Sequence, residues 1–196
     1  MLFQRPGLLS VALLAAACGG ADTEAKSGAA SPPVTDAQRL FPLDHNTVFS
    51  YETETTDSGK GILVVEVSRP RATMAELKVA GRVSRLYVTA EGIQYPTGGF
   101  LLKSPVSDDG EWQGDFGKVS VTRIGQAVEV PAGKFQNCVE TVEETDSPAF
   151  SKKTTSVYCP GIGMVSRHIE GEAGGVQVSE KLTLKSFGPR FVAGLP

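Results

Sequence analysis

The sequence predicts an all-β domain, a strongly curved antiparallel sheet of half-barrel or open-barrel form, with a β-sandwich as the alternative. Past residue 39, short runs rich in Val, Thr, Ile, Tyr and Phe alternate apolar with polar residues, and Gly, Pro and Asp clusters separate them. No stretch there repeats apolar residues at helical spacing. Without a helix to cover its apolar face, such a sheet must curl around its own side chains or pack on a second sheet.

The alternating runs predict the following strands in order: 47–55, 61–68, 74–79, 84–89, 92–95, 118–124, 126–130, 137–144, 154–159, 163–170 and 176–186. Glycines punctuate them, because glycine adopts the positive φ angles that tight turns need. Pro131-Ala132-Gly133 predicts one tight turn, and Pro160-Gly161 predicts another. In the last run, Val178, Leu182 and Leu184 alternate with polar residues, so one face of that strand is expected to meet water.

The N-terminus has the layout of a bacterial lipoprotein signal. Arg5 precedes an apolar run over residues 7–17, and Cys18 ends that run. A run of about 7–15 apolar residues is typical of a secretory signal, whereas a spanning helix needs about 20. The sequence therefore predicts a signal peptide at 1–17 and a diacylglycerol on the thiol of Cys18. An ordinary secretory signal cut near Ala17, which would leave a free thiol, is the alternative.

Residues 18–39 follow the signal as the lipidated cysteine and a small, polar stretch that predicts a flexible tether. We expect the β domain at 40–187 and a C-terminal tail at 188–196. The lipid anchor makes the membrane the predicted partner and the bacterial cell envelope the predicted location. In a Gram-negative host, Gly19 rather than Asp after the cysteine favours the outer membrane.

The charge of the mature chain excludes some partners. Loss of Arg5 with the signal leaves 18 of the 19 Lys and Arg residues against 22 Asp and Glu, a net charge of −4. An acidic chain of this kind does not favour nucleic acid or electrostatic docking on anionic headgroups. Acyl chains are therefore expected to hold it to the membrane.

Three cysteines cannot all pair in disulfides within one exported chain, so one must have another role. Lipidation of Cys18 supplies that role. Cys138 and Cys159 then remain as a pair in an oxidising compartment, where a disulfide is expected. Opposite each other on neighbouring strands, they define a hairpin in which paired residue numbers sum to 297. Val139 would then face Tyr158, and Glu144 would face Lys153, both favourable cross-strand pairs. Two buried free thiols are the alternative.

The residues that catalysis would need are not brought together by any motif. His45 and His168 are far apart, and neither has a cysteine or second histidine at ligand spacing. No nucleophile element accompanies Asp44-His45, and the acidic turns at 107–110 and 145–148 lack the alternating ligands of a calcium loop. We therefore expect no catalytic residue, no metal and no cofactor.

Four segments resemble motifs of a family of uncharacterised bacterial lipoproteins. They are Phe41-Pro42-Leu43 with the Thr47–Tyr51 run, similar to "FPL…GxxWxY"; residues 101–112, similar to "LxxP…GxxW"; residues 128–138, similar to "VxVPAGxFxNC"; and residues 158–165, similar to "YAPGVGLV". The chain departs from these patterns at Phe49, where Trp is commoner, and at Cys159, where Ala is usual. The resemblance spans about 41–187. It implies a curved antiparallel sheet similar to periplasmic lipoprotein carriers, and it implies no activity.

Two functions follow from these expectations. The first is a non-enzymatic binding or assembly module whose curved sheet holds a lipid, an acyl chain or a segment of a protein partner. The second is a structural envelope lipoprotein whose concavity its own side chains fill. For the first, the expected ligand wall is aromatic and consists of Phe49, Tyr51, Tyr87, Trp112, Phe116, Phe135 and Tyr158.

Overall fold

The computed structural model describes residues 34–147 and 150–191. Cys18, the predicted signal peptide and most of the predicted tether lie outside these residues. The described elements, in chain order, are α1 (Asp36–Leu40), β1 (Thr47–Thr55), β2 (Gly59–Arg71), β3 (Met74–Val79), β4 (Arg82–Val88), β5 (Gly92–Gln94), β6 (Phe100–Lys103), β7 (Glu111–Gln113), β8 (Lys118–Val130), β9 (Gly133–Ser147), β10 (Phe150–Cys159), β11 (Gly163–Ala173) and β12 (Val176–Pro189).

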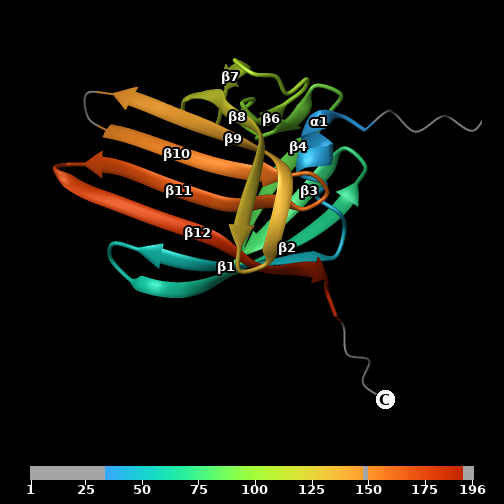
Figure 1. Cartoon of the computed structure of the whole chain (residues 1–196), viewed down its shortest axis with the longest axis horizontal. Helices are drawn as coiled ribbons and strands as arrows, with labels where there is room; N and C mark the ends of the chain where they lie inside the picture. The colour runs from blue at the N-terminus through green and yellow to red at the C-terminus, as the bar shows by residue number, and fades with distance from the viewer. Residues whose placement is uncertain (1–33, 148–149, 192–196) are drawn as a thin grey trace, which may run out of the picture. The chain divides into compact units, whose positions relative to one another are not determined.

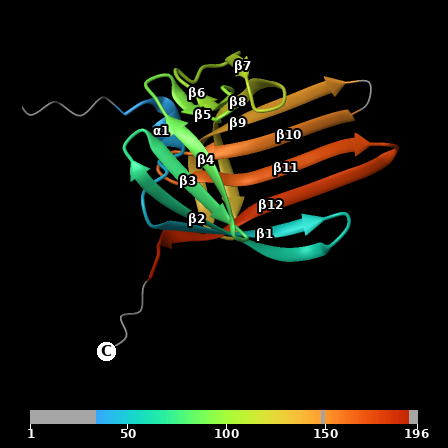
Figure 2. The ribbon, with the colours of Figure 1, turned by 180° about the vertical axis from the view of Figure 1, so that it is seen from behind.

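The strands form one antiparallel sheet in the order β6-β5-β4-β3-β2-β1-β12-β11-β10-β9-β8-β7. Most neighbours in the sheet are also neighbours in the chain, and the pairing of β1 with β12 joins the two halves (Figures 1 and 2). The sheet nearly closes into a barrel with one seam, between β6 and β7. The predicted strongly curved antiparallel sheet is therefore confirmed, and the sandwich alternative is not observed.

The seam is held by contacts other than a strand ladder. The indole Nε1 of Trp112 in β7 donates a hydrogen bond to the carbonyl of Phe100 in β6, at 3.0 Å. Beside it, Gly99 lies so close to Gly114 that a Cβ on Gly99 would overlap the Gly114 carbonyl. Thr97 donates to Asp115 at 2.9 Å across the same gap. Two glycines and one tryptophan thus bring the sheet edges together.

Most predicted strands are present, with small shifts at their ends. The predicted strands 118–124 and 126–130 are wrong as separate elements, because β8 runs through both. Gly125 has φ +80° there, and the register with β9 shifts on both sides of it, so the chain bends without leaving the sheet. Strands β6 and β7, of four and three residues, are not among the predicted strands.

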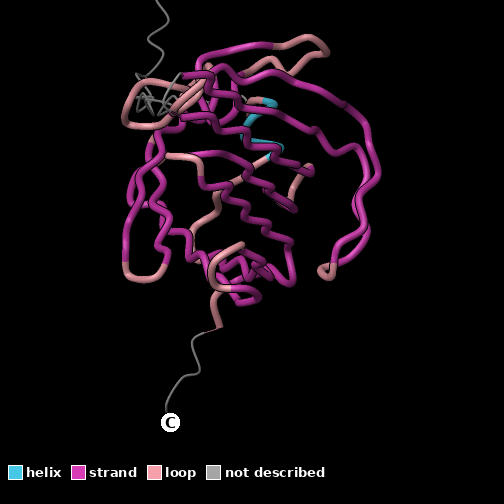
Figure 3. The backbone as a smooth tube through the Cα atoms, turned by 90° about the vertical axis from the view of Figure 1, so that its left-hand side faces the viewer, coloured by secondary structure: helices cyan, strands magenta, loops and turns pink. Residues whose placement is uncertain are grey.

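The expectation of no helix is wrong for residues 36–40, which form α1 within the end of the predicted tether. Thr35 caps its first turn by accepting a hydrogen bond from the amide of Gln38. Ala37 and Leu40 are buried in the core, and the amide of Ala37 donates to Ser104 Oγ at 3.0 Å. In Figure 3 the helix lies inside the curved outline of the strands. No helix among the described residues is long and apolar enough to cross a membrane.

Cys138 and Cys159 form a disulfide between β9 and β10, with 4.2 Å between their Cα atoms. The register of these strands is the predicted one, in which Val139 pairs with Tyr158 and Glu144 with Lys153. Lys153 Nζ lies 2.8 Å from Glu144 Oε1. This exposed pair raises the pKa of Lys153, mainly through the hydrogen bond from its ammonium to Glu144. Both sulfurs belong to the buried core.

Candidate binding cavity

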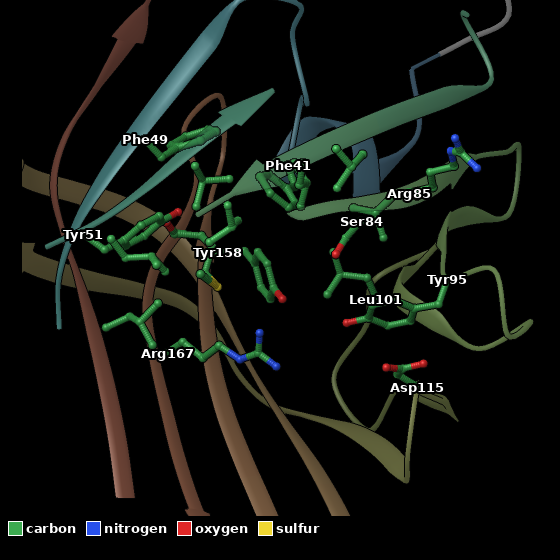
Figure 4. A pocket seen from close by; sticks show the side chains of 18 of the residues that line it. Phe41, Phe49, Tyr51, Ser84, Arg85, Tyr95, Leu101, Asp115, Tyr158 and Arg167 are labelled. Atoms are coloured by element: carbon green, nitrogen blue, oxygen red, sulfur yellow. The ribbon is translucent and has the colours of Figure 1, made fainter. Parts of the chain in front are cut away.

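The curved sheet forms the wall of an open cavity of about 680 Å³. Strands from both halves of the sheet contribute to its wall, and so do the β5–β6 loop and the β7–β8 turn (Figure 4). The wall includes Phe41, Phe49, Tyr51, Leu63, Val65, Leu77, Val79, Leu86, Tyr95, Leu101, Asp115, Tyr158, Met164, Arg167 and Leu182. Apolar side chains dominate it, as in most small-molecule sites.

The period of the strands explains why these residues share one face. Side chains two residues apart on a strand point to the same side of the sheet, and directly paired residues on neighbouring strands do so too. Tyr51 of β1 pairs with Leu63 of β2, and Phe49 pairs with Val65, which in turn pairs with Val79 of β3. The alternation of the sequence therefore builds one continuous apolar wall across three strands.

Three of the predicted wall residues line the cavity, namely Phe49, Tyr51 and Tyr158. The hydroxyl of Tyr51 donates to the carbonyl of Met164 at 3.0 Å, which ties β1 to β11 across the intervening β12. The ring centroids of Phe49 and Tyr51 lie 6.3 Å apart in a stacked arrangement, and Phe41 contacts both Phe49 and Tyr158. These contacts leave the aromatic wall little freedom to rearrange.

The other four predicted wall residues do not line this cavity, and each has a different reason. Tyr87 directly follows the cavity residue Leu86 on β4, so its side chain points to the opposite face of the sheet, where it is 41% exposed. Trp112 is used to close the seam.

Phe116 packs beneath Lys152, whose Nζ lies 3.6 Å from the ring centroid. Phe135 belongs to the bent end of the β8–β9 hairpin. There the amide of Ala132 donates to the carbonyl of Leu184 in β12, and Phe135 packs edge-on against Phe187. In Figure 1 this hairpin crosses β10 to β12. Phe135 is not among the residues that line the cavity.

Arg167 is the principal wall residue that the sequence does not reveal. Simple alternation along β11 groups Met164 with Ser166 and His168, which leaves Arg167 on the other face. The register with β10 shifts between Val157 and Tyr158, so Tyr158 pairs with Met164 and Ser156 pairs with Arg167. One bulge thus changes the phase, and both Met164 and Arg167 line the cavity. His168 lies outside it, with Nε2 3.2 Å from Ser179 Oγ.

Polar groups gather at one part of the cavity. Glu143 is 7% exposed, and its Oε1 accepts from the amides of Phe116 and Gly117 at 2.9 and 3.1 Å. A small adjoining cavity of about 20 Å³ is bounded by Glu143, Thr154, Tyr158 and Arg167, among others. The Nε of Arg167 and the hydroxyl of Thr154 are buried there without a hydrogen-bond partner in the described chain.

The electrostatics of this region follow from burial. Burial raises the pKa of the phenols of Tyr51, Tyr95 and Tyr158 above the ordinary range, and the nearby charge of Arg167 opposes that rise. Burial, with a smaller contribution from Arg167, lowers the pKa of Lys152. All three tyrosines are therefore neutral hydrogen-bond donors at physiological pH.

The two histidines stand apart from the cavity wall. His45 Nδ1 accepts a hydrogen bond from the amide of Arg69 at 3.1 Å, in the turn region before β1. Within residues 34–147 and 150–191, no group of three or more His, Cys, Asp or Glu is arranged to hold a metal ion. The residues that the cavity does present suit hydrogen bonding and apolar contact.

Comparison with known proteins gives little sequence support for any family. No protein-family model matches the chain, and no curated protein is significantly similar to it. The chain is similar to a proposed exported protein with a YmcC-like fold from Bacteroides fragilis, with a TM-score of 0.42 and 17% identity over 76% of this chain and 98% of that one. It is also similar to a proposed lipoprotein from Parabacteroides distasonis, with a TM-score of 0.41 and 12% identity over 80% of this chain and 100% of that one. Both TM-scores are too low to establish a common fold.

Proposed function

We propose that this protein is a lipid-anchored envelope lipoprotein whose β domain binds an acyl chain in the cavity of the curved sheet, without catalysis. The observation that carries the proposal is the cavity itself, with its volume of about 680 Å³ and mostly apolar wall. Small-molecule sites generally occupy about 300–1,000 Å³ and are lined in this way. The cavity favours binding over the structural alternative, in which the protein's own side chains would fill this space.

Two neighbouring valines on β2 provide a matched test. Val65 lines the cavity, whereas Val64 is 45% exposed on the other face of the same strand. Val65→Trp places an indole in the cavity and should weaken binding of methyl laurate about tenfold or more, because the ligand and the indole need the same space. Calorimetric titration of a chain shortened to begin at Gly19, which omits the lipidated Cys18 and retains every described residue, measures the affinity.

Val64→Trp is the control, and it should leave the affinity for methyl laurate unchanged. Melting curves of both variants establish that each is folded. Binding of neither methyl laurate nor laurate to the unmodified chain would contradict the proposed function. So would equal weakening by the two substitutions, because the ligand would then not occupy the cavity.

The membrane anchor is a separate part of the proposal and rests on the sequence around Cys18. Cys18→Ser removes the thiol that would carry the diacylglycerol, so an unprocessed precursor should accumulate. Globomycin, which blocks the lipoprotein signal peptidase, should cause the same accumulation of the unmodified chain. Immunoblots of fractionated cells would show the precursor, and outer-membrane fractions of a Gram-negative host should hold the processed form. Unchanged processing and membrane partitioning of Cys18→Ser would refute the lipid anchor.

A further inference from the structure

The guanidinium of Arg167 places a positive charge in the cavity. A purely apolar ligand would leave that charge without a partner. Arg167 reaches into the cavity from β11, between Ser156 of β10 and Leu182 of β12, its partners in the sheet. Figure 4 shows its guanidinium on the same side of the cavity as the hydroxyl of Tyr158. Tyr158 is only 2% exposed, so this cation lies beside an enclosed phenol.

The acidic residues near Arg167 do not neutralise it by direct pairing. Among the described residues, no carboxylate oxygen lies within 4.0 Å of its guanidinium, and its Nε has no hydrogen-bond partner. The Oε1 of Glu143 is occupied by two backbone amides. Asp115, which also borders the cavity, is exposed and accepts from Thr97. The guanidinium therefore lies in the cavity with an Nε–H donor that no described residue accepts.

A guanidinium beside apolar walls is stabilised by an anionic acceptor, and its planar donors match a carboxylate in a two-pronged arrangement. Two other charged side chains line the cavity, but Arg85 is paired with Glu76 at 3.1 Å and Asp115 accepts from Thr97. The apolar part of the wall, including Phe49, Leu63 and Leu77, suits a hydrocarbon chain. A ligand that satisfies both parts has one anionic end and one apolar tail.

We propose that the cavity selects long-chain carboxylates, with the carboxylate held by Arg167 and the tail along the apolar wall. This inference rests on the proposed function and specifies its ligand class. It assigns Arg167 as a specificity-determining residue, with the Tyr158 hydroxyl as a second donor to the carboxylate. Because the Arg167 contact depends on the charge, an ester of the same chain should lose it while keeping the apolar contacts.

The test compares laurate with methyl laurate by calorimetric titration of the same chain shortened to begin at Gly19. Laurate should bind about tenfold or more tightly than its ester, as expected for a charge-assisted contact. Arg167→Met keeps an unbranched side chain but removes the positive charge. It should abolish this preference while leaving ester binding in place. Arg123→Met is the matched control, because the Arg123 side chain is 68% exposed on β8, and it should keep the preference.

Several outcomes would overturn the inference and leave the proposed function standing. These are equal affinities of the unmodified chain for acid and ester, a preference that survives in folded Arg167→Met, or tighter binding of dodecyl phosphate than of laurate. Binding of neither laurate nor its ester would instead overturn both. Carbon-13 titration of carboxyl-labelled laurate needs no variant. The bound carboxylate should have a lower pKa than laurate free in dilute solution, and an equal or higher pKa would overturn the inference.

Discussion

Removal of the Cys138–Cys159 disulfide should lower the free energy of unfolding by about 3 kcal/mol. The bridge joins residues 21 positions apart, and a link of that span restricts the unfolded chain by roughly this amount. The sulfurs are fully buried, so replacing both cysteines by alanine also removes packed atoms from the core. Urea denaturation of Cys138→Ala/Cys159→Ala beside the unmodified chain measures the difference.

Reduction of the unmodified chain is the control, because it opens the bridge while both sulfur atoms stay in the protein. Reduced protein should unfold at a urea concentration between those of the oxidised protein and the double variant. Equal unfolding midpoints for all three would contradict the expected stabilisation. Alkylation of both thiols after denaturation without reductant would show that the bridge is absent from the exported protein.

Gly99→Ala should lower the free energy of unfolding by about 3 kcal/mol, because the new Cβ would overlap the carbonyl of Gly114 at the seam. Backbone atoms cannot move aside by a rotamer change, so the loops that carry these glycines must separate. The separation would also strain the hydrogen bond from Trp112 to Phe100. Thermal unfolding followed by Trp112 fluorescence should show both an earlier transition and altered emission before unfolding.

Gly98→Ala separates this clash from a backbone effect. Gly98 has φ +98°, a conformation unfavourable for alanine, but a Cβ there would meet no atom within 4 Å. We expect it to destabilise the domain by about 1 kcal/mol and to leave the native Trp112 emission unchanged. A larger loss for Gly98→Ala than for Gly99→Ala would refute the close approach of the two loops.

Much of the sheet was predictable because strand formation depends on a local period. Residues 47–55 and 74–79 form strands with the expected bounds. The β9–β10 register followed from two cysteines, since a disulfide between neighbouring strands leaves little choice of pairing. Helix α1 escaped prediction because five residues show no helical repeat. Its place is set by contacts with Ser104 and with Gly161, both distant in sequence.

The candidate site was predictable only in part, and the aromatic residues show why. Aromatic type alone indicated Phe49, Tyr51 and Tyr158 together with four residues that lie elsewhere. Nothing local distinguishes Tyr158 in the cavity wall from Trp112 at the seam. That difference arises from the pairing order of the strands, which places β7 at one edge of the sheet.

By itself, the sequence determined the all-β class, most strand positions and the pairing of Cys138 with Cys159. The strand positions follow from the local alternation of apolar and polar residues. The disulfide follows from the oxidising compartment to which the N-terminal signal is expected to send the chain. Only the tertiary structure decided that Arg167 faces the cavity and that a cavity exists at all. The orientation of the Arg167 side chain depends on one bulge opposite Tyr158. The cavity depends on how closely the two edges of the curved sheet approach each other at the seam. Both are properties of strands that meet across long stretches of chain, so no local pattern records them.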